Sequence, residues 1–150
     1  MISPLNRPLI SVIIPTRNRA ALVQKAITSV LQQSYSMLEC IVVDDASEDN
    51  TPEIITTISD PRLRYVRNST CRGAPASRNC GIAQARGSYI ALLDDDDEWL
   101  PEKIEKQVAL FSRAPDTVGL VYSGFVFVTS RSSNVFATVI PKKRGYVYKD

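Results

Sequence analysis

Short, nearly continuous apolar runs alternate along the chain with longer stretches in which apolar residues recur at helical spacing. The short β-branched runs are typical of strands buried on both faces, and the longer pattern is typical of amphipathic helices. The pattern predicts buried strands over residues 9–14, 40–43 and 89–93, and a short strand over residues 63–66. It predicts helices over residues 20–33 and 76–85, after Thr51, and from Pro101 to Pro115.

Proline and glycine mark several of the predicted boundaries. Pro15 is expected to end the first strand, and Thr51 to be the N-cap of a helix with Pro52 in its first turn. Gly87 is expected to close the third helix. The fourth helix is expected to place four apolar side chains on one face: Leu100, Ile104, Val108 and Phe111.

Repeated strand–helix units predict an α/β fold, a three-layer α/β/α sandwich with a mostly parallel sheet. The 150 residues match the length of one domain that can bury a core, so we expect a single domain over residues 1–150. Residues 118–129 are strand-prone and are expected to pair with residues 135–140 as a hairpin. The run over 118–128 is too short to cross a bilayer.

Three polar clusters follow predicted strands: Thr16 to Arg19, Asp44-Asp45, and Asp94 to Asp97. In parallel sheets, ligands bind outside the carboxyl ends of the strands. Although these clusters are distant in sequence, they are therefore expected to converge on one edge of the sheet and form a binding site.

Four consecutive aspartates and Glu98 make the last cluster strongly acidic. Like charges this close raise one another's pKa unless a cation neutralises them, and carboxylate oxygens select Mg²⁺, Mn²⁺ or Ca²⁺. The alternative is a solvated acidic turn that caps the helix at Pro101. An EF-hand loop is excluded because Trp99 stands where that loop needs glycine. A phosphatase with a nucleophilic aspartate is disfavoured because the first strand ends without a carboxylate.

Residue composition excludes several kinds of binding partner and site. A net charge of +2 gives no electrostatic footprint for nucleic acid. The chain has no histidine, and Cys40, Cys71 and Cys80 show no C-x-x-C spacing, which fits neither a disulfide framework nor a zinc site. A reducing, cytoplasmic location is therefore expected. Both common glycine-rich phosphate loops are absent, so a divalent ion, helped by Arg78, is the expected phosphate clamp.

Four motifs in order resemble family 2 glycosyltransferases, and the resemblance covers roughly residues 8–128. The motifs are Ile13 to Arg19 (IIPTRNR), Val42 to Ser47 (VVDDAS), Ala76 to Ile82 (ASRNCGI) and Leu93 to Pro101 (LDDDDEWLP). The resemblance implies the GT-A fold, typical of nucleotide-diphospho-sugar transferases. It also implies a nucleotide-sugar donor, often UDP-linked, Mg²⁺ or Mn²⁺ as the cofactor, and transfer with inversion.

The resemblance also implies roles for single residues. Thr16 would lie beside the base, Asp45 would accept from the uracil ring, and Arg78 would approach the base or its phosphates. Asp95 would contact the ribose. The metal would be held by Asp96, with Asp94 completing the D-x-D pattern.

Several residues keep two interpretations. Asp44 is expected either to hold the strand–helix turn or to touch the ligand, and Asn18 either to bind nucleotide or to satisfy loop backbone, as is Asn79. Arg17 and Arg19 are surface charges or ligand contacts. Trp99 is expected to anchor the core rather than to stack against a sugar ring.

In this family the acceptor site and the catalytic base lie downstream of the donor-binding half. Asp116 is the only acidic residue between Glu105 and Asp150, and its surroundings do not resemble that base. We therefore expect a donor-binding half whose base lies beyond Asp150, acting in the whole enzyme on a saccharide or lipid-linked acceptor of polysaccharide biosynthesis. A surface that the missing half would cover is expected to favour self-association.

Two other functions remain open. A module that binds nucleotide or metal without catalysis would share the same site. A nucleotidyltransferase is disfavoured because residues 15–21 contain neither the glycine nor the lysine of its phosphate loop.

Overall fold

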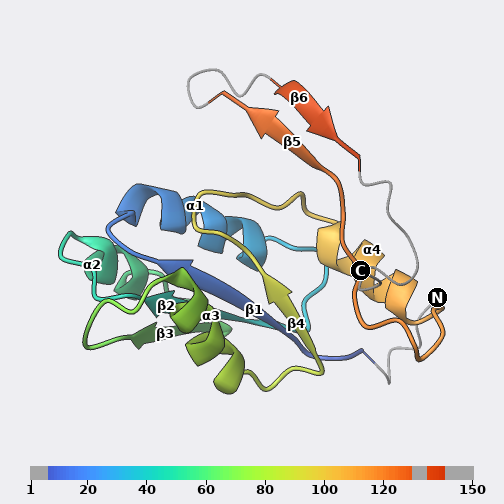
Figure 1. The fold of residues 1–150 in the computed structure, drawn as a ribbon, viewed down its shortest axis with the longest axis horizontal. Coiled ribbons are helices and arrows are strands. Elements are labelled where there is room, and N and C mark those ends of the chain that lie inside the picture. The colour runs from blue at the N-terminus through green and yellow to red at the C-terminus, as the bar shows by residue number, and fades with distance from the viewer. Residues whose placement is uncertain (1–6, 130–134, 141–150) are drawn as a thin grey trace, which may run out of the picture. The chain divides into compact units, whose positions relative to one another are not determined.

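The computed structural model describes residues 7–129 and 135–140 (Figure 1). The chain divides into two compact units, Met1–Ala109 and Leu110–Asp150. The first unit contains a parallel sheet with its helices, and the second contains an antiparallel hairpin. The expectation of a single domain over residues 1–150 stays a prediction.

The sheet of the first unit has the strand order β3-β2-β1-β4, and all its neighbouring strands are parallel. Each of the four strands predicted before the acidic run is confirmed, with no bound shifted by more than two residues. They are β1 (Ile10–Thr16), β2 (Leu38–Asp44), β3 (Leu63–Arg67) and β4 (Tyr89–Leu92). The central strands β1 and β2 are buried along their whole length, as a strand covered on both faces requires.

Helices cover both faces of this sheet. They are α1 (Ala20–Leu31), α2 (Thr51–Thr56), α3 (Ala74–Ala83) and α4 (Lys103–Phe111). One core joins alternate residues of β1 and β2 to α1, to Ile55 of α2, and to Ile104 and Val108 of α4. A smaller core lies under α3, which Figure 1 shows on the other side of the sheet from α1. The three-layer α/β/α architecture is therefore confirmed.

The predicted end of the first strand is wrong, because Pro15 lies inside β1 and pairs with Val43. The carbonyl of Ile13 accepts from Leu93 N–H on the β4 side, so Pro15, two residues later, faces the same side. Pairing between β1 and β4 stops at Ile13, and the N–H that proline lacks is therefore not needed.

The prediction that β4 is buried on both faces is also wrong. Tyr89 and Ala91 pack against the main core, but Ile90 and Leu92 are exposed. β4 is an edge strand, and α3 packs against β1 and β2. On the face that these residues share with Ile13, α3 covers Ile13 but leaves Ile90 and Leu92 exposed in the part of the chain that the structure describes.

Three helix boundaries differ from expectation. Thr51 is the first helical residue rather than the N-cap, and α4 begins at Lys103, which leaves Leu100 exposed outside the helix. Gly87 does not cap α3, whose C-cap is Gln84. A Cβ at Gly87 would lie 2.6 Å from the carbonyl oxygen of Leu9, so this glycine allows a close approach of two backbones.

The second unit contains the predicted hairpin, and its strands are β5 (Phe125–Val128) and β6 (Val135–Val139) in antiparallel pairing. The first strand is much shorter than the predicted run over residues 118–129. No helix among the described residues is long and apolar enough to cross a membrane.

Candidate nucleotide-sugar site

Backbone pairing brings the three polar clusters together at the carboxyl edge of the sheet. Asp45 N–H donates to the Thr16 carbonyl at 2.9 Å, so the ends of β1 and β2 lie side by side. Leu93 N–H donates to the Ile13 carbonyl at 3.1 Å, which brings the start of the acidic loop to the same edge. The Thr16 hydroxyl then donates to Asp95 Oδ2 at 2.8 Å. The predicted convergence is therefore present.

The acidic loop is partly neutralised by two arginines from different segments. Arg19 Nη1 donates to Asp95 Oδ1 and to Asp96 Oδ2, both at 2.9 Å. Arg78, on α3, pairs with Asp94. The charge of Asp95, followed by a hydrogen bond to it and the charge of Asp96, raises the pKa of Arg19. Arg19, predicted as a surface charge or a ligand contact, is therefore an ion-pair partner of this loop.

Asp97 is the member of the run that is least favourably placed as a charge. Burial, then the charges of Asp96 and Asp94, raise the pKa of Asp97 above its ordinary value. The repulsion expected from the sequence is therefore visible in this part of the loop.

Helix α1 and the turn just after it anchor the segment that follows the aspartates. Gln33 Nε2 donates to the Leu100 carbonyl at 2.8 Å, and Gln33 Oε1 accepts from Ile104 N–H at 3.0 Å. The Ser29 hydroxyl accepts from Trp99 N–H at 3.1 Å. Trp99 is half-buried and packs against the main core, and its ring lies 4.1 Å from Lys103 Nζ. This placement favours the core-anchor interpretation of Trp99.

Asp45 is buried and its carboxylate is surrounded by donors from the loop after β3. Its oxygens accept from Asn68 Nδ2 at 2.8 Å, Arg72 N–H at 2.9 Å and Gly73 N–H at 2.7 Å. The Cys71 thiol lies 3.2 Å from Oδ2. Burial alone would raise the pKa of Asp45, but these hydrogen bonds outweigh it and hold that pKa well below its usual range.

Asp44, next to it, holds the turn between β2 and α2. It is fully buried, and its carboxylate accepts from Ser47 N–H at 2.8 Å and from the Tyr65 hydroxyl at 2.6 Å. Ala46 adopts a positive φ of 58° in this turn. Of the two interpretations of Asp44, the geometry favours the turn.

Asn18 joins the loops that follow β1 and β2. Its backbone N–H donates to the Ser47 hydroxyl at 2.9 Å, and its Oδ1 accepts from Glu48 N–H at 2.7 Å. Asn18 has a positive φ of 53°, a conformation that asparagine tolerates better than most residues. Its contact with a nucleotide stays a prediction, as does any ligand contact of Asn79, which is exposed on α3.

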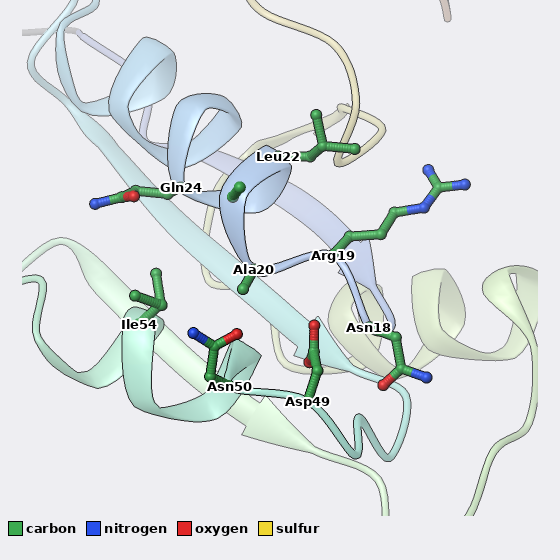
Figure 2. A pocket seen from close by; sticks show the side chains of 9 residues that line it. Asn18, Arg19, Ala20, Leu22, Gln24, Asp49, Asn50 and Ile54 are labelled. Carbon is green, nitrogen blue, oxygen red and sulfur yellow. The ribbon is translucent and has the colours of Figure 1, made fainter.

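An open hollow of about 430 Å³ lies between the start of α1 and α2 (Figure 2). It includes Asn18 and Arg19 but none of the aspartates of the acidic run. Figure 2 shows Asp49 and Asn50 pointing toward the start of α1, while the Arg19 side chain extends away from them. The hollow therefore adjoins the predicted site without enclosing it.

Two exposed carboxylates of the acidic loop suit the divalent cation that the resemblance implies. Among the described residues, no group of three or more His, Cys, Asp or Glu side chains is placed to hold a metal ion together. Asp94 and Asp96 are about half exposed, at 53% and 51%, and offer the hard oxygen ligands that Mg²⁺ and Mn²⁺ take. Because Mg²⁺ commonly uses one or two carboxylates with phosphates and water, this pair fits such a cation.

The sequence pattern did not identify the donors that surround Asp45, or the anchors that α1 and the turn after it supply. Asn68, Cys71 and Gly73 lie in a segment that reads only as an irregular loop, and Ser29 and Gln33 read as ordinary helix residues. Polar residues on the otherwise apolar face of α1 were the one available signal for its anchors.

The description "Glycosyl transferase family 2" belongs to the family model that matches residues 11–148. A putative colanic acid biosynthesis glycosyl transferase, WcaA of Escherichia coli K12, is 46% identical over 101 residues, which cover 66% of this chain and 36% of WcaA. The UDP-Glc:alpha-D-GlcNAc-diphosphoundecaprenol beta-1,3-glucosyltransferase WfgD of Escherichia coli is 33% identical and covers 92% of this chain and 53% of that protein. The chain therefore spans about one third to one half of these relatives.

Solved structures of similar proteins share the fold. The mannosyltransferase PcManGT from Pyrobaculum calidifontis, in complex with GDP-Man and Mn²⁺, has a TM-score of 0.66 and 29% identity, covering 75% of this chain and 34% of PcManGT. S. aureus TarS 1-349 in complex with UDP-GlcNAc has a TM-score of 0.65 and 25% identity, covering 77% of this chain and 37% of that chain.

Proposed function

Because the chain belongs to glycosyltransferase family 2, we propose that it forms the donor-binding part of an enzyme that transfers a sugar from a nucleotide sugar to an acceptor hydroxyl. The observation that carries this proposal is the convergence of Thr16, Asp45, Asp95 and the exposed pair Asp94 and Asp96 on one edge of the sheet. The donor is proposed to be UDP-linked, since one solved structure with this fold contains UDP-GlcNAc.

The residues of the site are proposed to divide the donor between them. Thr16 and Asp45, at the ends of β1 and β2, face the base; Asp95 accepts from the ribose; and Arg78 offers its guanidinium to the base or the phosphates. Asn18 is proposed to act beside them at the end of β1. All these side chains lie on elements of the rigid sheet layer or on loops bonded to it, which keeps the donor oriented.

Asp94 and Asp96 are proposed to hold Mn²⁺ or Mg²⁺. PcManGT, which shares the fold, was solved with Mn²⁺. When bound, such a cation stabilises the charge that develops on the departing diphosphate. We propose that the transfer inverts the anomeric carbon, and no catalytic base is assigned to a residue of this chain.

The acceptor is proposed to be a saccharide or lipid-linked saccharide of polysaccharide assembly, as the names of WcaA and WfgD suggest for those proteins. We propose that the protein is located in the cytoplasm, because nucleotide sugars are cytosolic metabolites and the described cysteines are free. Self-association is proposed through the exposed apolar side chains of β5 and β6.

Thermal unfolding with UDP, with Mn²⁺ and with both tests the donor site. UDP and Mn²⁺ together, at about 100 times the dissociation constant, should raise the melting temperature by about 5–10 °C. Either ligand alone should give a smaller shift. In Asp96→Asn the combined shift should be lost, because the main cation ligand is missing.

Glu53→Gln is the matched control, since it removes one exposed carboxylate from α2 outside the acidic run. Its shift with UDP and Mn²⁺ should equal that of the wild type. No shift in the wild type, or an equal shift in Asp96→Asn, would contradict the proposed donor site. A shift with Mn²⁺ that UDP never increases would instead favour a metal-binding module.

A further inference from the structure

Arg19 lies where two of the proposed ligand-binding carboxylates meet. One nitrogen, Nη1, donates to Asp95 Oδ1 and to Asp96 Oδ2, each at 2.9 Å. Asp95 is buried and Asp96 is half exposed, so the guanidinium links a buried carboxylate of the acidic loop to one that solvent reaches. A single positive group that joins two carboxylates occupies the electrostatic position of a cation.

The main chain of Arg19 is held firmly at the start of α1. Its N–H donates to the Thr51 hydroxyl at 3.2 Å, and its carbonyl accepts from Leu22 and Val23 N–H groups at 3.0 Å. The side chain itself is about half exposed. The backbone therefore stays in place while the long side chain is free to leave the carboxylates.

The charges of the loop match this interpretation. Asp94 to Asp97 carry four carboxylates, and Arg19 and Arg78 supply two positive charges to them. Arg78 pairs with Asp94 and Arg19 with Asp96, and a divalent cation would supply the same total charge to these two half-exposed carboxylates. Like charges this close need one compensation or the other.

We propose that Arg19 is an internal counter-ion that occupies Asp95 and Asp96 until a divalent cation replaces it at Asp96. This inference rests on the proposed function, because it takes Asp96 as a ligand of the cation. Arg19 is then a positioning residue: it holds the acidic loop against α1 in the cation-free protein and weakens cation binding by competition.

The test is the affinity for Mn²⁺ alone, measured by titration calorimetry or by the EPR signal of free Mn²⁺ without nucleotide. Arg19→Gln should bind Mn²⁺ about twofold to fivefold more tightly than the wild type, since an exposed ion pair is worth up to about fivefold in an equilibrium constant. Arg19→Lys keeps the charge but loses the planar fork, so its affinity should lie between the two. A residue that served only to stabilise the fold would give weaker binding when replaced.

Arg17→Gln is the matched control because it removes the same charge two positions away, from a side chain that contacts Cys71. Its Mn²⁺ affinity should equal that of the wild type. Equal tightening in Arg17→Gln and Arg19→Gln would overturn the inference, because net charge alone would then explain the effect. Should Arg19→Gln fail to fold, the Arg19→Lys affinity decides alone, and a value at or below wild type overturns the inference.

Asp96→Asn separates this inference from the proposed function. If the wild type binds Mn²⁺, Asp96→Asn abolishes that binding and Arg19→Gln does not tighten it, the counter-ion role is wrong and the proposed cation site stands. If no variant binds Mn²⁺, including Arg19→Gln, both are overturned.

Discussion

Individual carboxylates at the carboxyl edge of the sheet are each held by donors from distant parts of the chain. Asp45 receives the Asn68 side chain and the N–H groups of Arg72 and Gly73, and Asp95 receives Thr16 and Arg19. The two oxygens of a carboxylate offer about four lone pairs, so Asp45 is close to saturated by the protein itself. A nucleobase at Asp45 must therefore share or replace these donors.

Replacing Asp45 by asparagine should lower the free energy of unfolding by about 1–3 kcal/mol at pH 7, because buried hydrogen bonds to a charged group are lost. The native pKa of Asp45 is depressed, so its contribution is fully present above the unfolded pKa of about 3.9 and is lost as the pH falls toward the native pKa. The difference between wild type and Asp45→Asn in urea unfolding should therefore shrink below about pH 4.

The control for Asp45→Asn is Asp116→Asn, which alters an exposed carboxylate of the second unit. Its free energy of unfolding should stay within about 0.5 kcal/mol of the wild type. A difference for Asp45→Asn that is small, or that stays constant from pH 7 to pH 3, would show that the carboxylate charge does not hold this loop.

At the scale of elements, close packing of α3 on the sheet brings Arg78 toward the acidic loop. Gly81, on the buried side of α3, faces Ile13 of β1 and Val43 of β2. A Cβ at this position would lie 2.4 Å from Ile13 Cγ2, well inside the range of real contacts. The distance between this helix and the sheet therefore depends on the absence of a side chain.

Gly81→Ala should lower the free energy of unfolding by about 1–2 kcal/mol, because overpacking costs about 1–3 kcal/mol and helix propensity returns up to about 1 kcal/mol. Gly119→Ala is the control, since no atom lies within 4 Å of its added Cβ. Chemical denaturation of both variants measures the effect. Equal stability of the two variants would contradict the close contact between α3 and β1.

The network around Glu39 stabilises the opposite end of the sheet. Glu39, buried on β2, accepts from the Ser11 hydroxyl at 2.7 Å, from Arg64 at 2.9 Å and from Arg86 N–H at 2.7 Å. Burial alone would raise the pKa of Glu39, but the bonds from Ser11, Arg86 and Arg64 lower it. Three strands and the turn before β4 are thus joined at the end away from the proposed site.

On the scale of the whole molecule, the second unit exposes an unusual amount of apolar surface. All four residues of β5 are exposed, and both faces of this strand carry large apolar side chains. Isolated two-stranded hairpins are marginally stable in water, and exposed apolar patches favour association.

Light scattering should therefore show an average mass that rises with concentration in the wild type. Val126→Lys should reduce this rise by placing a charge in the middle of β5. Ile82→Lys, which changes a similarly exposed apolar residue of α3, should leave this rise unchanged. A wild type that stays strictly monomeric at high concentration would contradict self-association.

The sequence by itself determined which segments become strands and helices, and that Thr16, Asp45 and Asp94 stand at strand ends. Those features depend on local periodicity and residue chemistry, which a single chain displays directly. The sequence pattern assigned the wrong structural roles to Pro15 and Gly87, because those roles depend on the neighbouring strand rather than on adjacent residues.

Only the tertiary structure decided which groups neutralise and hold the polar residues. Arg19 and Asp95 are 76 positions apart, and Asp45 and Arg72 are 27 apart. Such contacts follow from strand order and helix packing. The sequence around one partner gives no indication of which distant residue will contact it. The same reason explains why β4 has an exposed face: coverage is set by where α3 packs, and not by the apolar run of β4 itself.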